Sequence, residues 1–313
     1  MIPREVLEAA TLAASSHNTQ PWRLRATGNT LEILPDFARR TPVVDPDDHH
    51  VYVSLGCAAE NAVIAATTFG LAGQVEFAPA SDGGVVRVVF ERSSLAASPL
   101  VVTLRARQCS RAVYDGRAVP AVDLQHLAAA GGSVLLITDR ARLTTIGEYV
   151  AEGNAAQLGD REFVRELVAW MRFTPGEARR HGDGLFGPAL GMPALPRLIG
   201  APLMRFAMRP ASQSARDRAA LRSSAGVAVF VSERNEPAAW VETGRRYERF
   251  ALEATRLGVR NAFMNQPVEV PALRSGLAGV LGLGGHRPSL IVRFGYGPGR
   301  PRSFRRPLED VLS

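Results

Sequence analysis

The sequence of 313 residues contains no lysine, so arginine supplies all 37 of its basic side chains. This absence excludes a P-loop lysine, a Schiff-base lysine for pyridoxal phosphate and a lysine general base. A phosphate or carboxylate group bound by the protein must therefore meet arginine side chains, backbone N–H groups or hydroxyls.

Cysteine and long apolar runs are also scarce. Cys57 and Cys109 have no CxxC spacing, which argues against a disulfide framework and against a zinc or redox-dithiol site. No apolar run approaches the roughly 18–20 residues of a membrane span, and the first residues lack a charged-then-apolar signal sequence. We expect both cysteines to be reduced thiols and the protein to be cytoplasmic.

The formal net charge is +7, but the arginines are scattered and form none of the basic runs of a nucleic-acid-binding arm. We therefore expect a small-molecule partner, with neither nucleic acid nor membrane bound. The length, with a hydrophobic content of 46%, suffices for two domain-sized cores or one large α/β body.

One motif occurs twice and is the clearest sign of internal organisation. The repeat pairs Gly56, Glu60, Ala66, Thr67 and Gly70 with Gly244, Glu248, Ala254, Thr255 and Gly258 at identical spacing, and Val53 and Val241 stand three residues before the first glycine of each copy. Each copy predicts a helix that is closed by a glycine and lies at the centre of one lobe.

The remaining periodicity predicts an α+β fold with a modest sheet in each lobe. Apolar and β-branched runs predict strands at 31–34, 85–90, 134–138, 227–232 and 289–294, and a further strand beginning at Arg23. Helical patterns occur at 4–14, 122–130, 140–152 and 160–171. We place a first lobe at 1–100 and a second at 101–313. Residues 174–216 are rich in Gly, Pro, Met and Arg, and form either a lid or a surface-packed excursion with short helices.

Three polar segments are candidates for an anion-binding site. Residues 15–22 read Ser-Ser-His-Asn-Thr-Gln-Pro-Trp, which suits a ligand with hydroxyls and a phosphate, or an ordinary capped loop. Arg107 and Arg111 lie four residues apart, so in a helix both side chains would lie on one face. That face would either bind one anion or be a solvated basic surface. The third segment contains Arg302, Arg305 and Arg306 and could equally be a charged tail.

Together these segments resemble the nitroreductase family, in particular its Acg-like branch of fused, two-lobed chains. The family's Arg-x-Ser-x-Arg motif, followed by an aromatic residue and Val-Pro, is similar to Arg107-x-Cys109-x-Arg111 with Tyr114 and Val119-Pro120. Its Ser-x-x-Asn-x-Gln-Pro-Trp segment matches residues 15–22, where Ala14 replaces a usual proline. The resemblance covers nearly the whole chain, including the repeated helix and the closing Arg-Arg-Pro-Leu-Glu.

The two motifs are divided between the halves of this chain, whereas one chain of an ordinary nitroreductase carries both and its dimer makes two flavin sites. The first half has Asn-x-Gln-Pro-Trp without a preceding arginine motif. The second has the arginine motif but only Gly131-Gly132-Ser133-Val134 after its helix. The resemblance therefore implies one FMN per chain, and a monomer that imitates the family's dimer.

The resemblance also implies a role for individual residues. Arg107 and either Arg305 or Arg306 would hold the FMN phosphate. Arg111 would lie near flavin N1 and the C2 carbonyl, where a fixed cation assists hydride acceptance at N5. The ribityl chain and phosphate would contact Ser15, Ser16, Asn18 and Gln20, and the N5 edge would lie beside Asn265 and Gln266. Cys109 replaces a hydroxyl residue, and because a thiol is a poor phosphate ligand, the affinity for FMN would be reduced.

Other constellations are weaker. The segment containing Asp45, Asp47, Asp48, His49 and His50 offers metal-ligating side chains, but adjacent histidines rarely face one ion, so we interpret it as a polar turn without a metal. Gly282-Leu283-Gly284-Gly285 lacks the GxGxxG spacing of a dinucleotide-binding turn.

The resulting hypothesis is an FMN-dependent oxidoreductase that takes electrons from NAD(P)H and passes them, in a ping-pong reaction, to nitroaromatic, quinone or other electron-poor acceptors. The flavin carries the chemistry, so no catalytic side chain is required. Two alternatives stay open. One is a flavin-binding or flavin-sequestering protein with little turnover, and the other is a biosynthetic flavin oxidase acting on a specialised metabolite.

Overall fold

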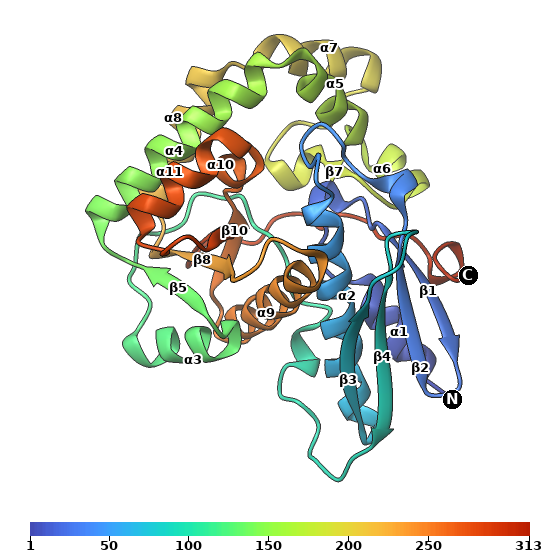
Figure 1. Cartoon of the computed structure of the whole chain (residues 1–313). Coiled ribbons are helices and arrows are strands. Elements are labelled where there is room, and N and C mark those ends of the chain that lie inside the picture. Colours follow the sequence, from blue (N-terminus) through green and yellow to red (C-terminus); the bar gives the residue numbers. More distant parts are fainter.

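The computed structural model describes residues 1–313 and contains two separate four-stranded antiparallel sheets (Figure 1). The first sheet has the order β1-β2-β4-β3 and consists of β1 (Trp22–Thr27), β2 (Thr30–Pro35), β3 (Leu71–Ala78) and β4 (Val85–Arg92). The second has the order β5-β8-β10-β9 and consists of β5 (Val134–Ile137), β8 (Gly226–Ser232), β9 (Arg260–Phe263) and β10 (Arg287–Gly295). The predicted α+β class, with one sheet per lobe, is confirmed.

The predicted strands correspond to β1, β2, β4, β5, β8 and β10, and only the strand predicted at 134–138 extends beyond the observed one, by one residue. The sequence analysis missed β3 and β9. The edge strand β3 is only partly buried along its length and contains Ala72-Gly73, so it lacks the apolar alternation of a half-buried strand. The four residues of β9 are too few to show a period.

The repeated motif forms the two helices at the centre of the molecule, α2 (His49–Ala66) and α9 (Pro237–Arg256), which pack directly against each other (Figure 1). The glycine that follows each helix has the left-handed conformation predicted for a helix end, with φ of 63° at Gly70 and 70° at Gly258. Before Gly70 the chain makes a short 3-10 turn, Thr67–Phe69.

One hydrophobic core joins the two lobes. A cluster of 42 buried residues extends from the first sheet through α2 and α9 to one face of the second sheet, and includes Trp22, Leu55, Phe230 and Phe250. A cluster of 12 covers the other face of the second sheet, beneath α4 (Arg140–Gly159) and α11 (Pro271–Leu281). The remaining helices around these sheets are α1 (Arg4–Thr11), α3 (Ala121–Gly131), α5 (Arg161–Trp170), α8 (Pro210–Arg222) and α10 (Gln266–Glu269).

Residues 174–216 contain regular structure. They form α6 (Pro175–His181), the strand β7 (Leu185–Phe186) that pairs with β6 (Met171–Arg172), α7 (Arg197–Ala207) and the first half of α8. This segment packs on its own small core of Val168, Met171, Phe173 and Met204. Its arrangement corresponds to the second of the two expectations, an excursion with short helices. None of the helices in the chain combines the length and the apolar character that crossing a membrane demands.

The C-terminal tail leaves the second sheet and returns to the first lobe (Figure 1). The backbone N–H of Leu24 donates to the carbonyl of Val311 over 2.7 Å, and that of Ser313 donates to the carbonyl of Leu24 over 2.9 Å. A boundary at residue 100 therefore separates the two sheets, but residues 304–313 run against the first lobe. Through this return the tail reaches the junction of the lobes.

Candidate functional site

A cavity of about 240 Å³ lies at the junction of the two lobes. Stretches distant in sequence line it, among them the loop after α1, the start of α2, residues 104–111, residues 263–269 and the tail at 301–305. Of the predicted site residues, the cavity is lined by Ser15, Ser16, Asn18, Arg107, Cys109, Arg111, Asn265 and Arg305. Gln20, Gln266 and Arg306 do not line it.

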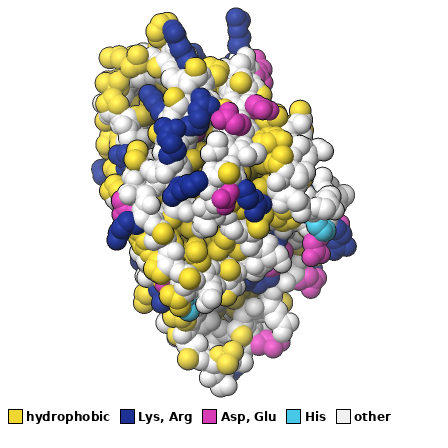
Figure 2. Space-filling model, turned by 90° about the vertical axis from the view of Figure 1, so that its left-hand side faces the viewer, with side chains coloured by type: hydrophobic (Ala, Val, Ile, Leu, Met, Phe, Trp, Pro, Cys, Tyr) yellow, Lys and Arg dark blue, Asp and Glu magenta, His cyan; other side chains and the backbone are white.

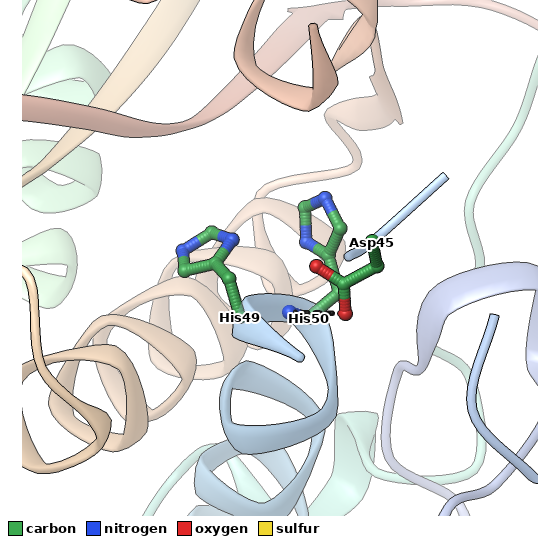
Figure 3. Close-up of side chains that lie close together, drawn as sticks. All are labelled: Asp45, His49 and His50. Carbon is green, nitrogen blue, oxygen red and sulfur yellow. Dashed lines mark hydrogen bonds between the residues drawn. The ribbon is translucent and has the colours of Figure 1, made fainter. Parts of the chain in front are cut away.

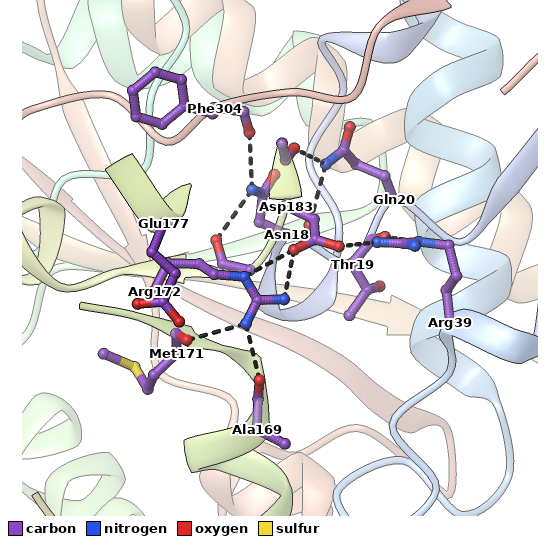
Figure 4. A network of polar contacts seen from close by, with 12 residues as sticks. Asn18, Thr19, Gln20, Arg39, Ala169, Met171, Arg172, Glu177, Asp183 and Phe304 are labelled. Carbon is purple, nitrogen blue, oxygen red and sulfur yellow. Dashed lines mark hydrogen bonds and ion pairs between the residues drawn. The ribbon is translucent and has the colours of Figure 1, made fainter. Parts of the chain in front are cut away.

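The loop after α1 has a strained backbone. His17, Asn18 and Gln20 have φ values of 49°, 56° and 54°, a left-handed conformation that is uncommon for residues other than glycine. Side-chain hydrogen bonds hold this conformation: the Asn18 amide donates to the carbonyls of Gly184 and Phe304 over 3.1 and 3.0 Å (Figure 4). These hydrogen bonds hold the loop in place, and with it Ser15 and Ser16 at the edge of the cavity.

Gln20 is fully buried and points away from the cavity. Its amide donates to the carbonyl of Gly182 over 2.9 Å (Figure 4). Its Oε1 accepts the backbone N–H of Arg306 over 2.9 Å. Beside it, Asp183 forms ion pairs with Arg39 and Arg172. Gln20 and Arg306 therefore connect the loop after α1 to residues 182–184 and to the C-terminal tail. These contacts hold the start of the segment that follows α6.

A buried group of two arginines and one glutamate forms the polar end of the cavity. Arg107 Nε lies 2.8 Å from Glu248 Oε1, and both side chains are almost fully buried. Arg107 and Arg305 also converge on one acceptor, the carbonyl of Leu12, over 2.8 and 3.4 Å. Burial and the charge of Arg107 lower the pKa of Arg305 to about 9, although Glu248 opposes the shift. The Nε of Arg305 has no hydrogen-bond partner.

Residues 107–111 are extended, so the helix considered for the two arginines is not formed. Arg107, Cys109 and Arg111 all line the cavity, and so does Gln108 between them. Arg111 is exposed and takes part in no ion pair with a carboxylate.

The segment after β9 contributes one of its two predicted residues. Asn265 lines the cavity, and its Oδ1 accepts the backbone N–H of Ile291 over 2.9 Å. The Gln266 amide instead donates to Asn154 and Asp217, each over 3.3 Å, behind the cavity wall.

The cavity also contains polar residues that the sequence analysis did not select, among them His17, His50, Glu269, Tyr247 and Arg302. Burial, with the nearby charges of Arg111 and His50, lowers the pKa of His17 to about 3, so its imidazole is neutral at pH 7. His50 Nε2 lies 3.6 Å from Glu269 Oε1. His17 and Arg302 stand inside segments that were already selected, whereas the meeting of α2 and α10 that joins His50 to Glu269 leaves no local pattern in the sequence.

Asp45 and His49 lie together with His50, which lines the cavity, and one candidate ligand atom from each of the three is within 4.8 Å of the others (Figure 3). Asp45 accepts the backbone N–H of His50 over 2.9 Å, and the His49 ring packs edge-on against Trp240 at 5.3 Å. Nearby arginines at 274 and 287 add positive charge. These contacts are those of a buried polar turn that starts α2.

The cavity residues fit FMN. Five arginines line the cavity, whereas Glu269 is the only lining residue with a carboxylate, and Glu248, next to the cavity, pairs with Arg107. A bound anion would balance the positive charge that remains. The unpartnered Nε of Arg305 is a buried donor without an acceptor in the protein. Away from this polar end, the walls are apolar and aromatic and suit a flat ring, with Val53, Leu104, Tyr247, Phe263 and Leu290 among them.

Comparison with known proteins agrees with this picture. The chain is 28% identical over 329 aligned positions to two curated proteins from strains of Mycobacterium tuberculosis, both provisionally named NAD(P)H nitroreductases, with 99% of this chain and 90% of each relative covered. No family model matches the chain.

Solved structures give a weaker match. An FMN-dependent nitroreductase from Mycobacterium smegmatis, in complex with NADPH, is 14% identical with a TM-score of 0.45 over 67% of this chain and 96% of that chain. A nitroreductase from Bacteroides fragilis with bound FMN is 16% identical with a TM-score of 0.40 over 64% and 89%. TM-scores below 0.5 add nothing to the fold argument.

The motifs that resemble the nitroreductase family thus lie in the two joined lobes and around the cavity between them. The resemblance seen in the motifs is confirmed over the full length by the two mycobacterial relatives.

Proposed function

We propose that the chain is an FMN-dependent oxidoreductase that oxidises NAD(P)H and reduces electron-poor acceptors such as nitroaromatics or quinones. The observation that carries this proposal is the convergence of Arg107 and Arg305 on one end of an inter-lobe cavity where a single buried carboxylate, Glu248, balances them. The names of the full-length relatives support the same reaction class.

Residues of both lobes would bind FMN. Arg107 and Arg305 would hold the phosphate, with Ser15 and Ser16 beside the ribityl hydroxyls. Arg111 would place its free positive charge against the ring, where charge develops during reduction. When bound, FMN supplies the transfer of hydride through N5. Neutral His17 adds no charge to this part of the cavity.

The second copy of the motif does not repeat the site. Glu60 occupies the position that matches Glu248, and it is paired with Arg245 Nε at 3.0 Å and with Arg249 at 3.1 Å. Both of these arginines come from α9 itself and also pair with Glu242, so two cations meet two carboxylates and none is left for a ligand. We infer one FMN per chain, in a monomer that is sufficient for the site.

The test is steady-state oxidation of NADH and of NADPH by the FMN-loaded protein, with a nitroaromatic and a quinone as acceptors. We expect acceptor-dependent turnover that Arg111→Ala lowers by about 100–1,000-fold, the loss typical of removing one electrostatic donor, while Arg117→Ala, at an exposed arginine outside the cavity, leaves it unchanged. Bound FMN without turnover would instead favour a flavin-sequestering protein, the second candidate.

A further inference from the structure

The helix α7 carries an exposed apolar face. Leu198, Ile199, Leu203 and Phe206 expose 91%, 57%, 51% and 73% of their surface, and Pro202 lies exposed among them. At 100° per residue these positions fall on one side of the helix. Gly200 and Met204 lie on the other side, where Gly200 packs against the ring of Phe173. The helix therefore buries one apolar face and leaves a second one to solvent.

The surroundings of this face are positively charged. Between residues 184 and 216 the sequence has four arginines and no aspartate or glutamate. Arg205 and Arg209 are exposed and form no ion pair, and Arg209 lies over the ring of Phe206 at 5.3 Å. The acidic side chains of the neighbouring helices are already engaged, for example Glu162 with Arg165 and Glu177 with Arg197.

Two views place these features at one end of the molecule. In Figure 1, α7 lies at the top, beyond α5 and far from the first sheet. Figure 2 shows hydrophobic side chains gathered toward this same upper end, with arginines beside them. An apolar helix face flanked by arginines is the pattern of a helix that lies in the interface of an anionic membrane.

We propose that α7 docks this protein on the surface of an anionic lipid bilayer. The apolar face would enter the boundary between headgroups and acyl chains, and Arg205 and Arg209 would contact the lipid phosphates. A second copy of the chain is a poorer occupant, because a symmetric contact would bring the unpaired arginines of both copies together. The sequence analysis expected no membrane partner because the chain has no membrane-spanning segment. A helix that lies in the membrane interface does not require such a segment.

The same segment adjoins the cavity. Leu185, Ala189 and Leu190 line the cavity wall, and Leu190 also packs on the small core that holds Met204 of α7. A bilayer held at α7 would therefore lie near the wall through which an apolar acceptor could reach the site. The docking proposal does not depend on flavin chemistry, and its test requires no turnover.

The test is co-sedimentation of the full-length protein with vesicles of phosphatidylglycerol and phosphatidylcholine, compared with vesicles of phosphatidylcholine alone, at low and high salt. We expect binding to the anionic vesicles only, weakened by salt. Leu198→Ser combined with Phe206→Ser should abolish it, and Arg205→Gln combined with Arg209→Gln should lower the partition coefficient by roughly 30-fold. The matched control is Leu95→Ser with Arg92→Gln, exposed residues at the end of the first sheet, and it should bind like the wild type.

Three results would overturn the proposal. The first is no sedimentation with anionic vesicles at low salt, and the second is equal binding by the α7 variants and the control. The third is a concentration-dependent dimer in solution that the Leu198→Ser, Phe206→Ser variant abolishes, because the face would then be covered by a second copy. Circular dichroism of each variant establishes that the fold is retained.

Discussion

Gly56 and Gly244 each face the backbone of the other's helix through the same contact. A Cβ atom on Gly56 would lie 1.9 Å from the carbonyl oxygen of Val241, and one on Gly244 would lie 1.9 Å from the carbonyl oxygen of Val53. The valine three residues before each glycine is thus the contact residue for the other one. The repeat seen in the sequence is a pseudo-twofold relationship in space, and it fixes how the two lobes meet.

Substitution of either glycine by alanine should separate the central helices. Because backbone atoms cannot give way as a flexible side chain does, we expect Gly56→Ala or Gly244→Ala to reduce the free energy of unfolding by roughly 3 kcal/mol or more. The matched control is Gly279→Ala in α11, where an added Cβ has no atom within 4 Å. Urea unfolding should show the control to be neutral or slightly stabilised. Equal effects at all three glycines would disprove the helix-crossing argument.

The two buried glutamates of the repeat should respond differently to loss of their partners. Arg107→Ala removes the partner of Glu248 at the cavity and should abolish FMN binding, besides costing about 3–5 kcal/mol of stability for the unpaired carboxylate. Arg245→Ala removes one of two partners of Glu60 and should lower stability while the protein still binds FMN. Flavin absorbance per chain, together with thermal unfolding, separates the two outcomes. Loss of FMN in both variants would contradict the assignment of the site to one side only.

A substitution at Cys109 should increase the affinity for FMN. Replacing its thiol by a hydroxyl, Cys109→Ser, adds a better hydrogen-bond donor to the cavity wall. We expect FMN affinity to rise by about 2–10-fold, the effect of one additional hydrogen bond. Cys109→Ala is the matched variant, which removes the thiol without adding a donor and should show no gain in a fluorescence titration. An equal gain in both variants would attribute the effect to space alone.

The turn before α2 should make stability depend on pH. Burial raises the pKa of Asp45 from its usual 3.8 to about 7, so the folded protein holds this proton more tightly than the unfolded chain. Stability should therefore fall as pH rises from about 4 to 7 and stay level above, with a total cost of at most about 4 kcal/mol. Asp45→Asn keeps an acceptor for the N–H of His50 but cannot ionise. Its stability advantage over the wild type should grow from pH 4.5 to pH 8; parallel curves would show that Asp45 does not carry this effect.

Features that depend on local pattern could be predicted from the sequence, and features that depend on long-range contact could not. The repeat predicted the central helices through its closing glycines, Gly70 and Gly258, whereas the contact of Gly56 and Gly244 with the opposite helix is seen only in the structure. Arg107 and Arg111 both reach the cavity without the helix that was considered for them. The direction of Gln20 and the pairing of His50 with Glu269 depend on segments more than 150 residues away, and nothing in their own sequence surroundings indicates it.

The central claim is that the two lobes build one flavin site, with Arg107 and Arg305 from the second lobe and Ser15 and Ser16 from the first. The measurement that tests it most directly is the visible absorbance spectrum of the purified protein, titrated with FMN, in the wild type and in Arg305→Gln. We expect saturation at about one FMN per chain, with clearly weaker binding in the variant and unchanged circular dichroism. Two FMN per chain, no binding at all, or full affinity in Arg305→Gln would contradict the account.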